Sequence, residues 1–305
     1  MSRPARFIFG SIGALALASP GHAHGLPAAN ASGWWTRWNP DPLTLASMVF
    51  LVVFYGYGLS RLMRRRGERA TVRPRHVLAF GAGVIVLALA LVSPVDGLAD
   101  DLQWMHMVQH MLLMNVAAPL VVMGAPWRVM LWALPAARRR WPGQGRRALV
   151  RRGVPRYLFW QPLLLLVLYA LVLWTWHVPV LYEAALANRW IHDGQHIAFF
   201  AVAALFWRVL FDPIGHLQMS RGTAILYLFG TSLHATVLGV LMALAPRLWY
   251  PTYAGRTEAW GLAALEDQQF AGYIMWMPAC MVYAVIAAVL CAHWLREDAP
   301  EAARG

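Results

Sequence analysis

The chain has 305 residues, of which 59% are apolar and 13% charged, and it contains 16 tryptophans. A soluble domain carries about 25% charged residues, so a water-facing surface cannot be built from this composition. A soluble globule, a disordered chain, a coiled coil and a disulfide-stapled module are therefore excluded, and an all-α polytopic membrane protein is predicted.

The N-terminal residues are typical of a signal peptide. Arg3 and Arg6 precede the apolar stretch Phe7–Ala18, whose 12 residues are too few to span a bilayer. Gly21 and Ala23 place small residues before the expected cleavage point. An uncleaved membrane anchor is the alternative. The predicted organisation is a signal peptide (1–23), a periplasmic segment (24–42), a transmembrane domain (43–295) and a cytoplasmic tail (296–305).

Apolar segments of transmembrane length follow in chain order. A helix needs about 20 apolar residues to cross the hydrocarbon core. Segments in lipid must be helical because each backbone amide needs an internal partner. Trp127–Leu134 is too short to span and is predicted to be interfacial. Seven segments qualify: Leu43–Leu62, Val77–Ser93, Leu102–Met123, Leu158–Trp176, Trp190–Phe211, Thr223–Ala245 and Gln268–Trp294.

The loops between these segments differ in charge. All 26 basic residues are arginine. Arg61–Arg75 holds seven of them and Arg128–Arg156 nine, whereas Pro94–Asp101 holds three aspartates. The positive-inside rule places both arginine loops in the cytoplasm, the N-terminus outside and the C-terminus inside. The arginines are explained by topology, so nucleic-acid binding is not expected. Tryptophans expected at the inner interface are Trp127, Trp141, Trp207 and Trp294.

A repeated histidine motif is the clearest chemical signal. The third span begins with His106 and His110, and the fifth with His192 and His196, each pair within the pattern HxxQH. Residues i and i+4 share a helix face. Both spans run from outside to inside, so the pairs lie at the same depth. His177 closes the fourth span at the same end.

These residues suit a metal site. Neutral imidazole binds copper, zinc or iron, and a helix N-terminus disfavours the imidazolium form. Met107 and Met111 lie beside the first pair, and thioether sulfur favours Cu(I), so copper is the expected metal. The alternative is that the histidines and methionines only fill the helix interface.

Polar residues near the pairs are candidates for a supporting role. Asp267 and Gln268 open the seventh span, and Gln109 and Gln195 lie inside the two motifs. They could orient the imidazoles by hydrogen bonding. For Asp267 the alternative is capping of a helix N-terminus. The sequence has no Walker loop, GxSxG or HExxH motif, and no enzymatic activity is expected.

Several stretches carry a family resemblance. They are Asp101–Leu113 with Ala118-Pro119-Leu120, Trp176–Tyr182 with His192 and His196, and Asp267–Gly272 with Met275-Trp276. Together they resemble the CtaG-type assembly factors of haem–copper (caa3-type) cytochrome c oxidase, over about residues 95–280. Glu is common in that family where Gln195 stands, and Ala where Glu266 stands.

The resemblance implies a seven-helix protein of the bacterial inner membrane that matures cytochrome c oxidase by handling copper. The expected ligands are His106, His110, His192 and His196, with His177, Met107 and Met111 as additional ligands. The expected supporting residues are Asp267, Gln109, Gln195 and Gln268. Oxidase subunits or a periplasmic copper chaperone are the expected partners, besides membrane lipid.

Two functions from other classes remain open. One is a b-type haem electron carrier with histidines of two helices as axial ligands. The other is a zinc-dependent seven-span hydrolase, in which Asp101 or Asp267 would be the general base.

Overall fold

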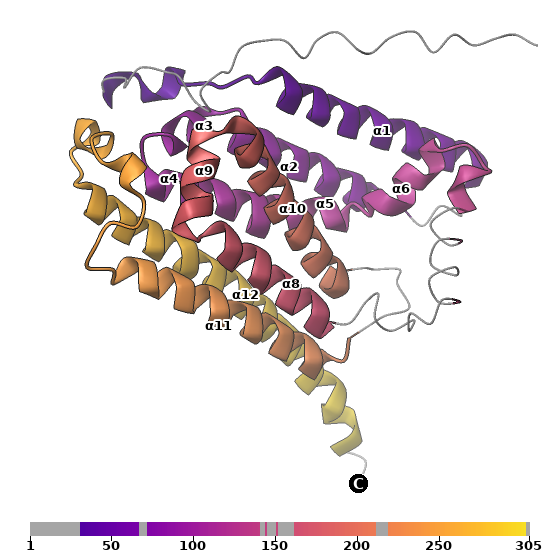
Figure 1. Cartoon of the computed structure of the whole chain (residues 1–305). Coiled ribbons are helices and arrows are strands. Elements are labelled where there is room, and N and C mark those ends of the chain that lie inside the picture. The colour runs from indigo at the N-terminus through magenta and orange to yellow at the C-terminus, as the bar shows by residue number, and fades with distance from the viewer. Residues whose placement is uncertain are drawn as a thin grey trace, which may run out of the picture.

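The protein is a bundle of long helices. The computed structural model describes residues 31–66, 72–140, 162–211 and 219–302, together with the isolated residues 144 and 151. Within these ranges it contains helices and no strand. Successive long helices run in opposite directions along the bundle (Figure 1). The predicted all-α fold class is confirmed.

The helices of the described ranges follow one another with short connections. In chain order they are η1 (Ala31–Thr36), α1 (Pro42–Arg66), α2 (Pro74–Leu91), α3 (Pro94–Ala99), α4 (Gln103–Met111), η3 (Leu112–Ala117), α5 (Ala118–Met123), α6 (Pro126–Ala133), η4 (Arg138–Arg140), α8 (Pro162–Trp176), α9 (Pro179–Ala187), α10 (Arg189–Phe211), α11 (Arg221–Ala243), η6 (Pro251–Tyr253), η7 (Thr257–Trp260) and α12 (Ala264–Ala302).

The membrane spans match the number expected from the sequence. Six helical segments are long and apolar enough to cross a bilayer. The bent pair α8 and α9, which meet at 68°, makes a seventh when it is counted as one broken span. A multi-pass membrane protein is therefore confirmed, whereas its orientation in the membrane stays a prediction. The signal peptide, much of the second arginine loop and the predicted start of the fourth span at Leu158 lie outside the described residues.

The break between α8 and α9 follows from a proline. Pro179 disfavours helical backbone at the residue before it, and Val178 accordingly has φ −63° and ψ 127°. The helix α8 therefore stops at Trp176 and the chain turns. His177 lies in this turn and is buried, so the break directs an imidazole into the bundle rather than toward its surface.

The third span widens in its middle for a related reason. Pro119 has no N–H for a helical bond, and the preceding turns form the π-helical segment η3. The N–H of Ala118 bonds to the carbonyl of Leu113, five residues earlier. The carbonyl of Met114 instead accepts a bond from the Trp207 indole at 2.8 Å. The prediction that Trp207 lines a membrane interface is wrong, because its side chain is fully buried between these helices.

The last two spans, α11 and α12, pack closely against each other. A Cβ added to Gly272 of α12 would lie 2.6 Å from the carbonyl oxygen of Gly239 in α11. Only glycine allows this approach, and small residues at helix interfaces let membrane helices pack by close van der Waals contact. The contact fixes the N-terminal part of α12 against α11, beside the start of α4.

Candidate metal centre

Two histidine pairs occupy the starts of α4 and α10. The ring centroids of His106 and His110 are 4.4 Å apart, and those of His192 and His196 are 4.2 Å apart. All four side chains are buried. Each pair spans one helical turn, as the i, i+4 spacing predicts.

The two pairs face each other across the bundle. Ring centroids are separated by 5.4 Å for His106 and His192, and by 5.4 Å for His110 and His196. One nitrogen from each of His106, His110 and His196 lies within 4.8 Å of the others. The prediction that the two HxxQH motifs meet in space is confirmed.

A fifth imidazole reaches the same place from the broken span. The His177 ring centroid is 6.4 Å from that of His110. Its Nδ1 lies 2.7 Å from the carbonyl oxygen of Leu173. A carbonyl can only accept, so Nδ1 carries the proton and Nε2 keeps its lone pair. His106, His110, His177, His192 and His196 are called the imidazole cluster below.

The imidazole cluster fits a metal ion by donor type and by spacing. Two nitrogens bound to one ion at about 2.0–2.1 Å can be at most about 4.2 Å apart. The 4.8 Å bound on the three nearest nitrogens is close to this limit, and small ring rotations would close the difference. Neutral imidazole is a ligand for copper, zinc and iron. The three-residue group found among the described residues contains no carboxylate.

Aromatic rings surround the imidazole cluster. Phe199 lies 4.6 Å from His110 and Tyr182 lies 5.3 Å from His106, between ring centroids. Tyr182 stacks on Tyr250 at 4.0 Å, and the Tyr253 hydroxyl is 3.4 Å from His106 Nδ1. Tyr250 and Tyr253 come from the connection between α11 and α12. Sequence reasoning missed both, because a loop has no periodicity that assigns its side chains to a face.

Two of the three predicted supporting glutamines bond to groups other than the imidazoles. Gln109 Nε2 donates to Asp96 Oδ1 at 2.6 Å and to the Ala90 carbonyl at 2.9 Å. Gln268 bridges the chain at 247–249, accepting from the Trp249 N–H and donating to the Arg247 carbonyl. Gln195 is fully buried, and neither of its amide atoms has a hydrogen-bond partner in the described part of the chain.

Asp267 caps the start of a helix other than the one to which it belongs. Its carboxylate accepts from the N–H groups of Gln103 at 2.6 Å and Trp104 at 3.2 Å. Asp267 belongs to α12, and these are the first amides of α4. The carboxylate therefore caps the helix that carries His106 and His110.

The two candidate methionines follow the α4 histidines by one residue each. They consequently share the neighbouring face of the helix. Met107 is fully buried. The Met111 sulfur accepts from Asn115 Nδ2 at 3.2 Å.

The comparisons with known proteins decide the family. A family model described as cytochrome c oxidase caa3 assembly factor matches residues 53–297. The chain belongs to this family. The matched residues include the whole imidazole cluster. Arg37 and Asn39, which bond to Asp101 and Asp96, lie before the start of the match.

Relatives of this caa3 assembly factor family member are found in mycobacteria. An uncharacterized protein of Mycobacterium bovis is 25% identical over 282 residues, and one of Mycobacterium leprae is 24% identical over 274 residues. Each alignment covers 88% of this chain and 41% of the relative, so the chain spans about two fifths of the length of these relatives. No solved structure matches the chain.

Buried charges lie beside the imidazole cluster of this family member. Arg37 Nη1 pairs with Asp101 Oδ2 at 2.5 Å, and Trp260 Nε1 donates to the same oxygen at 3.3 Å. Asp100 is buried between acidic neighbours. Burial, together with repulsion from Asp96 and Asp101, raises the pKa of Asp100 to about 9, so this carboxyl is neutral at physiological pH.

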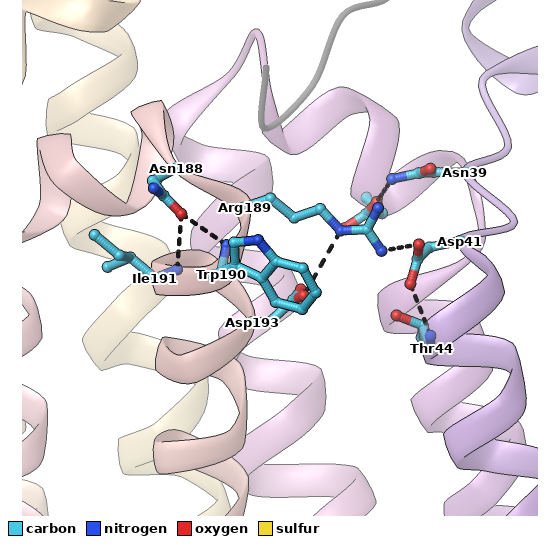
Figure 2. Close-up of polar contacts among 9 residues, drawn as sticks. Asn39, Asp41, Thr44, Asn188, Arg189, Trp190, Ile191 and Asp193 are labelled. Carbon is cyan, nitrogen blue, oxygen red and sulfur yellow. Dashed lines mark hydrogen bonds and ion pairs between the residues drawn. The ribbon is translucent and has the colours of Figure 1, made fainter. Parts of the chain in front are cut away.

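The start of α10 is held in a more exposed network. Figure 2 shows Arg189 reaching from α10 toward Asp41 beside α1, and toward Asp193 one turn along its own helix. Asn188 precedes the helix, and its side-chain oxygen accepts from the N–H groups of Trp190 and Ile191 (Figure 2). The first turn of α10, which carries His192, is therefore capped by its own neighbouring residue.

Proposed function

We propose that this chain binds copper at the imidazole cluster and holds it for insertion into a haem–copper cytochrome c oxidase. The observation that carries this proposal is the convergence of five buried imidazoles from three separate spans. The family supplies the process, because its members are described as assembly factors of a cytochrome c oxidase. A haem–copper oxidase needs copper to become active, so a histidine site in such a factor has an evident cargo.

Packing alone accounts poorly for the imidazole cluster. A buried polar atom left without a hydrogen bond costs about 1–3 kcal/mol. Both ring nitrogens of His110 and Nε2 of His177 have no hydrogen-bond partner among the described residues. A bound ion would satisfy such nitrogens. Burying these rings without hydrogen bonds destabilises the metal-free protein, and it leaves their lone pairs available for an ion.

The two rival functions are less well supported. For a haem, Phe199 and Tyr182 stand against the imidazole rings, where a porphyrin would need open space between axial ligands. For a zinc hydrolase, both candidate general bases are already engaged. Asp101 pairs with Arg37, and Asp267 caps α4.

Copper would be handled at the periplasmic side of the inner membrane under this proposal. Arg61 and Arg128, with which the two arginine loops begin, belong to the end of α1 and to α6, which lie at the opposite end of the bundle from α3 and α4 (Figure 1). The positive-inside rule then turns the cluster outward. An oxidase subunit or a periplasmic copper chaperone would be the partner that exchanges copper at this end.

The test is metal binding by the purified full-length protein. We expect stoichiometric copper by elemental analysis, no haem absorption, and Cu(I) affinity measured against a competing chelator. The double variant His110→Ala, His196→Ala should lose the copper. His234→Ala removes a histidine of α11 that lies outside the imidazole cluster, and should keep it. Copper retained in the double variant, or haem in the wild type, would overturn the proposal.

A further inference from the structure

Tyr253 occupies a special place beside the imidazole cluster. It ends the short helix η6 in the connection between α11 and α12, and its side chain is fully buried. Its hydroxyl lies 3.3 Å from the Ala99 carbonyl, 3.3 Å from the Tyr182 hydroxyl and 3.4 Å from His106 Nδ1. One phenol oxygen therefore joins α3, α4 and α9 at the site.

The direction of these hydrogen bonds follows from valence. A phenol has one proton to donate and two lone pairs to accept with. The Ala99 carbonyl can only accept, so the Tyr253 proton goes there. Tyr182 then donates to the Tyr253 oxygen, and the second lone pair is left for His106. Nδ1 of His106 must carry a proton to use it.

The phenol has that proton under all relevant conditions. Burial raises the pKa of Tyr253 well above its ordinary value, and the nearby carboxylate of Asp267 acts in the same direction. Tyr253 is thus a fixed neutral donor to Ala99 and a fixed acceptor for its other neighbours.

We propose that Tyr253 is a positioning residue that holds His106 in the Nδ1–H tautomer, which puts the lone pair of the ring on Nε2 as a metal-binding atom. The inference rests on the proposed function for the identity of the metal, although the tautomer itself is a property of the metal-free protein. Outer hydrogen bonds of this kind fix the ring orientation and raise the basicity of a histidine ligand.

His177 shows the same arrangement with a main-chain partner. Its Nδ1 donates to the Leu173 carbonyl at 2.7 Å, which leaves Nε2 available. For His106, the Tyr253 oxygen lies 3.4 Å from Nδ1 and takes the corresponding place. Two imidazoles from different spans thereby present the same nitrogen, one through the backbone and one through a side chain that can be changed.

The first experiment reads the tautomer directly. Nitrogen NMR of the full-length, metal-free protein with isotope-labelled histidine distinguishes a protonated Nδ1 from a protonated Nε2 at mildly alkaline pH. The His106 signal is identified by its absence in His106→Asn. We expect a protonated Nδ1 in the wild type, and a mixture of both tautomers in Tyr253→Phe.

The second experiment measures metal affinity. Tyr253→Phe keeps the ring and removes only the acceptor, and we expect Cu(I) and Zn(II) to bind about 10–100-fold more weakly. Tyr169→Phe is the matched control, since it also removes a buried hydroxyl paired with another tyrosine, Tyr283, away from the imidazole cluster. Its metal affinity should stay at the wild-type value.

The outcomes separate the two proposals. If Tyr253 instead donated to His106, the wild type would show a protonated Nε2 and Tyr253→Phe would bind metal as well as or better than the wild type. Either result overturns the positioning role. A wild type that shows the expected tautomer but binds no copper overturns the proposed function alone. The wild-type spectrum, assigned with His106→Asn, decides the tautomer even if Tyr253→Phe fails to fold.

Discussion

The helices α4 and α10 share the HxxQH motif, yet the protein holds them in different ways. The start of α4 is capped by Asp267, which is 164 residues away in the chain and fully buried. The start of α10 is capped by Asn188, the residue immediately before it. Gln109 of α4 makes two buried hydrogen bonds, whereas Gln195 of α10 makes none within the described residues.

The ion pairs follow the same division. Arg37 and Asp101, beside α4, expose only 4% and 9% of their side chains. Arg189, at the start of α10, exposes 38%, and its partner Asp41 exposes 11%. One half of the site is therefore anchored by buried bonds, and the other by the Asn188 cap and by a more exposed ion pair. We expect α4 to be the fixed half and α10 the half that shifts at lower cost.

The largest contrast is expected between the two arginines. Arg37→Gln leaves the buried Asp101 without its charged partner, which costs about 3–5 kcal/mol of unfolding free energy. Arg189→Gln breaks a half-exposed pair and should cost about 0–1 kcal/mol. Thermal unfolding of the full-length variants in one detergent checks both values. Equal losses would contradict the division into a fixed and a movable half.

The next effect concerns the ligands themselves. His110 lies within the three-residue nitrogen group, and His192 lies outside it. We expect His110→Ala to weaken copper binding by about 100-fold or more, and His192→Ala by about 10-fold. Insertion should persist in both, because it depends on the apolar spans and the arginine loops. Chelator competition on the purified variants provides the comparison.

The same variants test the process in cells. At wild-type abundance, His110→Ala and His196→Ala should lower the activity and copper content of the oxidase. Added copper should partly restore both if the protein only raises local copper supply, and should not if it also docks the oxidase. Normal oxidase in both variants and in the double change would mean that the imidazole cluster is not the working site.

Gln109 and Gln195 hold the same position in the two HxxQH motifs, but we expect their replacement to change the free energy of unfolding by different amounts. Gln109→Leu removes a donor from Asp96 and from the Ala90 carbonyl, and we expect a loss of about 2–3 kcal/mol in unfolding free energy. Gln195→Leu replaces a buried amide without a described partner by an apolar group of similar size. Its stability should be unchanged or higher. A large loss for Gln195→Leu would indicate a bond formed outside the described residues.

Much of the fold follows from the sequence alone. The span predicted at Trp190–Phe211 is observed as α10, Arg189–Phe211. Its length and apolarity are properties of the segment itself. The π-helical segment Leu112–Ala117 was not predicted, because its stability depends on the Trp207 indole reaching a released carbonyl from another span. Pro119 indicates that a helical hydrogen bond is lost nearby, but the sequence does not show which group bonds to the released carbonyl.

Some residues of the candidate site could also be predicted from the sequence, and others could not. His106, His110, His192 and His196 could be grouped from helical periodicity and shared depth. Tyr253 could not, since it lies in a connection whose path is set by tertiary contacts. Asn188 is recognisable as a cap from its place before a helix. Asp267 is not recognisable as the cap of α4, because nothing local to either segment relates them.

The two caps provide the smallest and most discriminating test. Asp267→Ala should cost about 2 kcal/mol, because two N–H groups of α4 lose a buried acceptor, and Asn188→Ala about 0.5–1 kcal/mol at an exposed start. Metal binding adds a second difference. His106 follows the capped Gln103 by three residues, so loosening the first turn of α4 should weaken copper binding, while Asn188→Ala should leave it near the wild-type value. Asp267→Asn retains one acceptor oxygen and should recover part of both losses. If Asn188→Ala lowered copper affinity as much as Asp267→Ala, the start of α10 would be as important to the site as the start of α4, and the two halves would have to be regarded as equally fixed.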